Sequence, residues 1–369
     1  MVEKVVVGPV VADRGSHAFG FLPITTAGDG GNIGIGVHVL AGHRPGPKLV
    51  VMATSHGQEY RQIASLMQLV EEIDPAVLVG DLVLVPVQNP VAFEMGSRGS
   101  WIDGLWGDSG NMNRVWPGRE NGWLTERFAH AIVRDVFPDA TVIMDLHAPT
   151  REFHLSYGYL GKGEPGDLSY DVPRAFGQEM LMWNSPEELV EKGQSSTTAM
   201  AYASSQGYVT YGGEIGEFHG LGVDRDQHSA EELYRGVPEV GFTGITNVMK
   251  YLGMIEGELK LPPRQIRVTP ELNLRPNHGG LLISNVGVED LGTVIPGGTV
   301  LGRVISPYSF EVLDEIVAPF EESILTACHY QKPFDKVLPG EFVYLVGDNK
   351  RTEEVPPLTT HRAAAQPRA

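Results

Sequence analysis

The segment KLVVMATSHGQEYRQIASLMQLVEEI, residues 48–73, contains the two periodicities on which the predicted fold rests. Residues 49–53 are apolar without interruption, which is typical of a strand buried on both faces of a sheet. Between residues 60 and 73 the apolar side chains recur at intervals of three and four, which predicts an amphipathic helix. The polar sequence HGQE, residues 56–59, therefore lies in the turn between a strand and a helix.

Strands and helices alternate along the chain on both sides of this unit. Apolar segments at residues 82–87, 141–146 and 208–211 predict three further strands. A helix is predicted between the second and third strands because its apolar residues share one face: Leu124, Phe128, Ile132, Val133 and Val136. This alternation predicts an α/β fold, in which a mostly parallel, twisted sheet carries helices on both faces.

The residue pattern changes from about Arg267, where short runs of Val, Leu and Ile are separated by Gly and Pro. We therefore predict a main domain at residues 1–262, a small Gly-rich β domain at residues 263–350, and a disordered tail at residues 351–369. Residues 294–304 and 337–347 resemble each other and indicate a duplicated turn-plus-strand unit. Residues 151–195 show no clear period and indicate an insertion.

The composition restricts the class of protein. A formal charge of −18 over 369 residues argues against a large phosphate-binding surface, so no nucleic-acid partner is expected. A single cysteine, Cys328, rules out an internal disulfide framework and fits a reducing compartment. The sequence contains neither a secretory leader pattern nor a run of about 18 apolar residues, so we expect a cytoplasmic protein without a membrane span.

The polar clusters follow the predicted strands, at the sheet edge where ligands bind in folds of this class. His56 and Glu59 follow the first strand, and Asp145 and His147 end the third. Residues two apart on a strand share a face, so Asp145 could orient His147 while His147 binds a metal. Each pair taken alone also fits ordinary loop polarity. Other histidines remain as alternative ligands: His43, His130, His154 and His219.

Further candidates lie in the loops after the other strands. Glu214 follows Gly212 and Gly213, and a carboxylate there could exchange protons with water activated by a metal; Glu217 is the competitor. Arginine suits the recognition of a substrate carboxylate or an oxyanion, and Arg98 and Arg114 both lie between the second and third strands. Asn113 or Asn111 could donate to the same carboxylate. Any of these side chains could instead simply face solvent.

The ordered set of motifs HGxE, NPxAF with a following arginine, NRxxPG, DxH and a late ExG resembles the succinylglutamate desuccinylase and aspartoacylase family, relatives of the zinc carboxypeptidases. The resemblance runs from about residue 48 to 216, and the β region to about 347 is similar to the family's C-terminal domain. It implies a zinc carboxypeptidase-like catalytic domain with one Zn²⁺ per chain. The implied zinc ligands are His56, Glu59 and His147. The other implied roles are carbonyl polarisation for Arg98, substrate carboxylate binding for Asn113 and Arg114, and general base for Glu214.

The chain departs from the family pattern between Arg98 and Asn113, where the spacing is longer than usual. The leading hypothesis is a zinc-dependent deacylase that cleaves a small N-acyl amino acid or a similar amide. A carboxypeptidase acting on short peptides is the second hypothesis, and a carrier protein is the third. Carrier modules need a lysine at a hairpin tip, and the turns 295–298 and 338–341 have none. Cobalt or manganese would suit N and O ligands nearly as well as zinc, and association into a homo-oligomer stays open.

Overall fold

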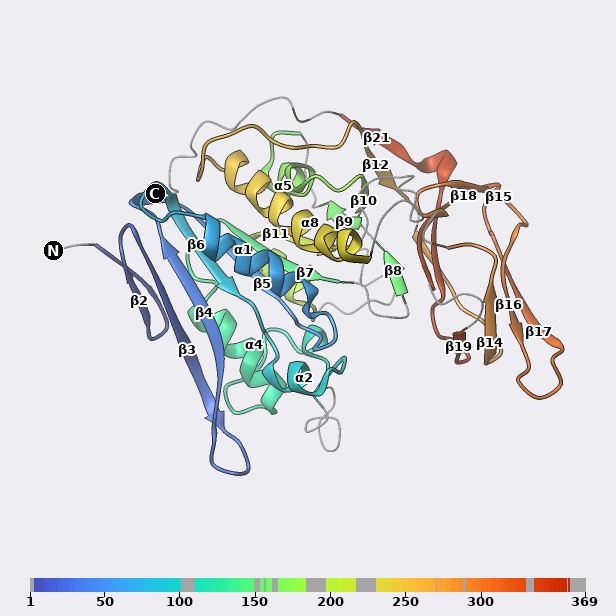
Figure 1. The fold of residues 1–369 in the computed structure, drawn as a ribbon, viewed down its shortest axis with the longest axis horizontal. Coiled ribbons are helices and arrows are strands. Elements are labelled where there is room, and N and C mark those ends of the chain that lie inside the picture. The colour runs from blue at the N-terminus through green and yellow to red at the C-terminus, as the bar shows by residue number, and fades with distance from the viewer. Residues whose placement is uncertain are drawn as a thin grey trace.

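The large sheet of the molecule contains ten strands in the order β21-β12-β10-β9-β11-β7-β5-β6-β4-β3 (Figure 1). Two smaller sheets lie beside it, built from strands in the C-terminal part of the chain together with β8 (Phe153–Leu155). The computed structural model describes residues 3–100, 110–148, 153–155, 157–160, 165–183, 197–216, 230–269, 271–287, 290–329, 335–356 and 358.

The centre of the large sheet is the block of parallel strands that the apolar segments predicted. It consists of β6 (Val79–Val85), β5 (Arg44–Ala53), β7 (Val142–His147) and β11 (Val209–Glu214), paired in that order. Strands β5 and β6 begin earlier in the chain than predicted. Because parallel strands end at the same edge, the residues that follow β5, β6, β7 and β11 are brought together there.

The flanks of the sheet mix parallel and antiparallel pairs. On one side a long antiparallel hairpin joins β6 through β4, and a separate short hairpin precedes it. On the other side β9 runs antiparallel to β11, and β10 and β12 continue in parallel. The bounds are β1 (Lys4–Val7), β2 (Val10–Asp13), β3 (Ser16–Thr26), β4 (Asn32–Ala41), β9 (Tyr157–Leu160), β10 (Met180–Trp183) and β12 (Gln265–Val268).

Helices cover both faces of the sheet, as predicted. Side chains alternate along β5, so that Leu49 and Val51 enter one hydrophobic core while Val50 and Met52 enter the other. The first core includes residues of α1 (Ile63–Glu72), α5 (Leu168–Phe176) and α8 (Ala230–Tyr251). The second includes residues of α4 (Leu124–Asp135) and α7 (Ala199–Ser205). Within the described residues, no helix combines the length and apolar character that crossing a membrane requires.

The C-terminal sheets form a separate β structure with its own core, at the right of Figure 1. One sheet has the order β13-β20-β18-β15, with β8 paired to β18, and the other has the order β17-β16-β14-β19. The bounds are β8 (Phe153–Leu155), β13 (Glu271–Leu274), β14 (Gly280–Ser284), β15 (Val294–Pro296), β16 (Val300–Ile305), β17 (Val312–Val317), β18 (Glu322–His329), β19 (Asp335–Val337) and β20 (Tyr344–Asp348).

Strand pairing divides the chain differently from the predicted boundaries at residues 262/263 and 350/351. Strand β12 pairs in parallel with β10, so residues 265–268 belong to the large sheet. Strand β21 (Glu353–Val355) pairs with β12, although a disordered tail was predicted from residue 351. Both strands are only a few residues long, and a strand of that length leaves little periodicity in the sequence. The chain therefore leaves the large sheet after β12 and returns to it with β21.

Candidate metal centre

A tight turn after β5 carries His56 and Glu59. Thr54 has a left-handed backbone, with φ 57°, and the 3-10 helix η1 (Tyr60–Gln62) begins directly after Glu59. Gly57 packs against α2 (Pro90–Met95) so closely that an added Cβ would lie 1.8 Å from the Ala92 carbonyl oxygen. The glycine of the HGQE sequence therefore allows the turn to lie against the neighbouring helix.

The NPxAF motif builds that neighbouring helix. The Asn89 side chain accepts a hydrogen bond from the Ala92 N–H at 3.1 Å, and Pro90 occupies the first helical position, where its missing N–H costs nothing. Gly96 ends the helix in the left-handed region, with φ 57°. Helix α2 thus supports Gly57 from one side and leads into the loop that carries Arg98.

The carboxylate of Glu59 lies between two imidazoles. Its Oε1 is 2.8 Å from His56 Nδ1, and its Oε2 is 2.8 Å from His147 Nδ1. All three residues are buried, and each offers a ligand atom within 4.8 Å of the others. The three predicted ligands, which come from different parts of the chain, are thus brought together around one point.

The other ring nitrogens have acceptor partners. His56 Nε2 lies 3.0 Å from Asn111 Oδ1, and His147 Nε2 lies 3.1 Å from Asp145 Oδ2. Gln88 Nε2 in turn donates to Asp145 Oδ1 at 2.7 Å. Since these oxygens accept, each Nε2 donates, and in a neutral ring Nδ1 then points a lone pair at Glu59. Two acceptors face each other unless a proton or a cation lies between them.

The electrostatics favour a cation at this point. Burial acts to raise the pKa of Glu59, but the two histidines outweigh it and hold that pKa far below its usual range. Burial lowers the pKa of His56, whereas Asp145 and Glu59 outweigh burial at His147 and raise its pKa well above normal. Two imidazole nitrogens and one carboxylate are the donor set of a catalytic zinc site, so the residues present fit a zinc ion in place of the proton.

Comparison with known proteins identifies the family of this chain. A model of the succinylglutamate desuccinylase/aspartoacylase catalytic domain matches residues 45–235, which is more than half of the chain. The chain belongs to this family. The resemblance stated from the motifs is therefore confirmed, and the matched segment contains β5, β6, β7 and β11 with the loops that follow them.

Individual relatives agree with this assignment. The chain is 28% identical over 322 residues to the N-alpha-acetyl-L-2,4-diaminobutyric acid deacetylase of Halomonas elongata, covering 84% of both proteins. Its fold is similar to that of the product-bound ectoine utilization protein EutE (DoeB) of Ruegeria pomeroyi, with a TM-score of 0.73, 22% identity and coverage of 94% and 99%. A succinylglutamate desuccinylase/aspartoacylase protein of Rhodobacter sphaeroides has a TM-score of 0.74 at 19% identity, with coverage of 95% and 99%.

Glu214 lies at the end of β11, beside the predicted ligand His147. It is the register partner of His147 in the parallel β7–β11 pair. Burial and the charge of Glu59 raise the pKa of Glu214, whereas the charges of His147 and Arg98 act to lower it. The resulting pKa of Glu214 is about 7. A carboxyl group with this pKa can both accept and return a proton near neutral pH. The competing Glu217 lies outside the described residues.

The two arginines lie at the same edge of the sheet. Arg98 Nη1 is 3.6 Å from Glu59 Oε1, and the Arg98 side chain is 53% exposed, so its guanidinium can also meet a ligand. Burial and the neighbouring charge of Arg98 lower the pKa of Arg114. Arg114 Nη1 donates to the Asn113 carbonyl oxygen at 2.6 Å. Two cations close together at this edge suit an anionic ligand.

The two asparagines are held by the protein itself. Asn111 Oδ1 accepts from His56 and from the Asn113 N–H at 3.0 Å, so Asn111 orients a candidate zinc ligand. Asn113 Oδ1 accepts from the Ala199 N–H at 2.9 Å, which holds the Asn113 side chain beside His147. The sequence predicts both side chains only as contacts to a substrate carboxylate, whereas the structure gives them partners within the protein.

Two glutamines that no sequence motif indicated contact residues of the candidate site. Gln88 holds Asp145, and the Gln178 side chain donates to the Glu214 carbonyl oxygen at 2.9 Å. Neither lies in a motif with a recognisable spacing. The one available signal for Gln88 was its position directly after the second predicted strand.

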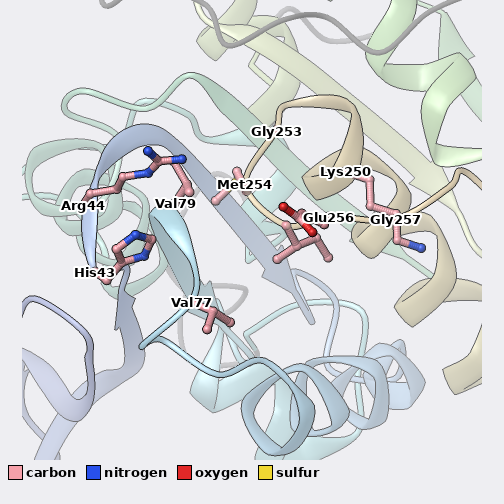
Figure 2. Close-up of a pocket in the computed structure, with 10 residues that line it drawn as sticks. His43, Arg44, Val77, Val79, Lys250, Gly253, Met254, Glu256 and Gly257 are labelled. Atoms are coloured by element: carbon pink, nitrogen blue, oxygen red, sulfur yellow. The ribbon is translucent and has the colours of Figure 1, made fainter.

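The alternative ligand His43 lies away from this edge. It lies directly before β5, whose other end leads to His56, and its Nδ1 contacts the Leu78 carbonyl oxygen at 2.7 Å. It lines a cavity of about 700 Å³. Figure 2 labels other residues that line this cavity: Arg44, Val77, Val79, Lys250, Gly253, Met254, Glu256 and Gly257. The side chains of His154 and His219 lie outside the described part of the chain.

Proposed function

We propose that this protein is a zinc-dependent deacylase that cleaves the amide bond of an N-acyl amino acid. The observation that carries the proposal is the placement of Glu59 between His56 and His147, with the Glu214 backbone paired to His147 on the adjacent strand. This arrangement puts a cation-binding donor set beside a carboxyl group that titrates near neutral pH. Membership of a deacylase family supports the same reaction.

The residues divide the work of the reaction. His56, Glu59 and His147 would hold the metal, and a bound divalent ion lowers the pKa of water and polarises the scissile carbonyl. Glu214 accepts a proton from the attacking water as the oxygen bonds to the carbonyl carbon. It then delivers that proton to the amine nitrogen as the carbon–nitrogen bond breaks, so the carboxyl group ends in its starting state.

Arg98 and Arg114 supply positive charge for two negative groups. We assign Arg98 to the oxyanion that develops on the carbonyl oxygen, because its guanidinium lies 3.6 Å from Glu59 and remains half exposed. We assign Arg114 to the carboxylate of the amino acid, with which a guanidinium forms two parallel hydrogen bonds. The backbone carbonyl oxygen of Asn113 accepts a hydrogen bond from the Arg114 guanidinium, which would hold that guanidinium in place for the carboxylate.

One relative and the net charge support a substrate class for this proposal. The Halomonas elongata relative is named as a deacetylase of N-acetylated 2,4-diaminobutyric acid, so an N-acetyl diamino acid is our leading substrate. Such a substrate carries a free ammonium group, and a chain with a formal charge of −18 attracts cations over long distances. The carboxyl group of the substrate would still be recognised locally by Arg114.

A substrate panel with metal analysis tests the proposal. Purified protein is assayed on N-acetyl-2,4-diaminobutyrate, N-acetyl and N-succinyl derivatives of other amino acids, and dipeptides, before and after removal of metal. We expect release of acetate from the diamino acid derivative, loss after chelation and recovery with zinc. Faster cleavage of dipeptides would identify a carboxypeptidase instead. The absence of hydrolysis with a full complement of bound zinc would refute the deacylase assignment.

A further inference from the structure

A buried glutamine outside every sequence motif connects two residues of β11. The Tyr211 hydroxyl donates to Gln178 Oε1, and Gln178 Nε2 donates to the backbone carbonyl oxygen of Glu214 at 2.9 Å. Gln178 is 6% exposed and Tyr211 is fully buried. The oxygen and the nitrogen of the Gln178 amide thus both form hydrogen bonds to β11, the strand that ends at Glu214, the proposed general base.

The backbone of Gln178 is itself held in place. The residue lies in the short connection between α5 and β10, directly after Gly177, which ends α5 in the left-handed region with φ 98°. Gln265 Nε2 donates to the Gln178 carbonyl oxygen at 2.9 Å and to the Arg174 carbonyl oxygen at 3.1 Å. The amide of Gln178 therefore projects from a fixed point toward β11.

Two facing glycines leave the space that this amide occupies. Gly158 on β9 and Gly213 on β11 are register partners. A Cβ added at Gly158 would lie 2.6 Å from Gln178 Oε1, and one added at Gly213 would lie 2.5 Å from the Tyr211 hydroxyl. Real Cβ atoms do not approach other atoms so closely, so the contact depends on glycine at both positions.

Tyr211 fixes which way the Gln178 amide faces. Its ring stacks on Phe176 with a centroid separation of 4.4 Å, and burial raises the pKa of its hydroxyl well above normal, so the hydroxyl stays a donor. A donor at this position selects the oxygen of the amide, which leaves Nε2 directed at Glu214. On the other side of the same peptide, the Ile215 N–H donates to the His147 carbonyl oxygen at 3.0 Å.

We infer that Gln178 is a positioning residue for Glu214: it fixes the Glu214 peptide from the side opposite β7 and thereby aims the carboxyl group at His56, Glu59 and His147. Tyr211 acts on Glu214 only indirectly, because its hydroxyl fixes the orientation of the Gln178 amide. The inference rests on the proposed function, because it assumes that Glu214 transfers protons. It concerns the direction of that side chain and not the binding of metal or substrate.

The test compares Gln178→Met and Tyr211→Phe with wild-type protein. The first variant keeps the length of the side chain and removes both hydrogen bonds, and the second removes only the hydroxyl while the stacked ring remains. For Gln178→Met we expect kcat to fall roughly 10- to 100-fold, as for other misplacements of a catalytic group, with KM and bound zinc unchanged. For Tyr211→Phe we expect a smaller fall in kcat.

Two controls separate positioning from a general loss of structure. Gln206→Met makes the same chemical change at an exposed site and should leave kcat unchanged. The double variant Gln178→Met/Tyr211→Phe should be no slower than Gln178→Met, because both changes remove one chain of hydrogen bonds. Gly158→Ala changes the neighbouring strand β9 and should lower kcat as Gln178→Met does, since the added methyl group would displace the Gln178 amide.

The outcomes distinguish this inference from the proposed function. If wild-type protein deacylates and folded, zinc-loaded Gln178→Met retains its kcat, the positioning role is wrong while the deacylase assignment stands. A fall in kcat that only follows the fall in bound zinc, or additive losses in the double variant, would also overturn it. If Gln178→Met does not fold, an unchanged kcat in Tyr211→Phe decides against the inference and a reduced kcat at full zinc content supports it.

Discussion

Glu59 Oε2 lies 2.8 Å from His147 Nδ1, although 88 residues separate the two positions in the chain. The contact exists because β5 and β7 are parallel neighbours, with Ala53 paired to Leu146 immediately before the two polar loops. The metal hypothesis depends on this pairing, since neither the HGQE turn nor the DLH strand end provides enough ligands alone.

Removing a ligand should abolish metal binding. His147→Ala deletes one of the three donors and leaves Glu59 with a single imidazole, so we expect bound zinc to fall to background in elemental analysis and hydrolysis to disappear with it. His130→Ala is a matched control, because His130 lies on α4 and is not in the group formed by His56, Glu59 and His147. Retention of one zinc ion per chain by the His147 variant would contradict the ligand assignment.

Removing the general base should leave the metal in place. Glu214→Gln keeps the size of the side chain and removes its ability to accept a proton. We expect kcat to fall by roughly 10²- to 10⁴-fold, while zinc content and the KM of the substrate stay near the wild-type values. Full activity in this variant would exclude Glu214 and direct attention to another carboxylate.

The rate should depend on the protonation of Glu214. Its pKa is raised to about 7, so the carboxyl group retains its proton below that pH and becomes an active base as the pH rises. A bound divalent cation favours the charged form, so the acidic limb of a kcat/KM profile should lie at or below about 7. A profile that stays flat from about pH 5 to about pH 8 would show that no such group controls the rate.

Asp145 should affect metal affinity through His147. Asp145 Oδ2 lies 3.1 Å from His147 Nε2, and replacing it with Asn substitutes a neutral amide for the carboxylate. Loss of such a partner weakens metal binding by about 10- to 100-fold in other proteins, and we expect the same order in a competition titration with a chelator. Equal zinc affinity in Asp145→Asn and wild-type protein would remove this role.

Gly57→Ala should destabilise the turn that carries His56. The added methyl group would lie 1.8 Å from the Ala92 carbonyl oxygen, so the turn or α2 must move. Overpacking of this kind costs about 1–3 kcal/mol, which should appear as a lower midpoint in denaturant unfolding. Gly28→Ala, where an added methyl group meets nothing within 4 Å, is the matched control. Equal midpoints for the two variants would rule out a close contact at Gly57.

The sequence predicted the parts of the fold that have strong periodicity. Residues 49–53 showed an uninterrupted apolar run because β5 is buried on both faces, and the amphipathic helix after it corresponds to η1 and α1. The hairpin β3–β4 was not predicted, although apolar residues alternate with glycines and a histidine along β4 from Ile33 to Val39. The short strands β12 and β21 join the large sheet through pairing with distant strands, which a local pattern does not record.

The candidate site was predictable where polar residues follow apolar strands. His56, Glu59, His147 and Glu214 all have that local signal, and the structure brings them to one edge. The supporting residues lack it. Gln178 reaches Glu214 from a connection between α5 and β10, and its role depends on space left by glycines on two other strands. Such a contact is defined only once the tertiary structure is known.

A crystal structure of the zinc-loaded protein with anomalous data at the zinc edge would show whether His56, Glu59 and His147 bind one ion. We predict one ion at about 2.0–2.2 Å from the Nδ1 atoms of His56 and His147 and from the carboxylate of Glu59. An ion bound elsewhere, or imidazoles turned away from a common centre, would contradict the account.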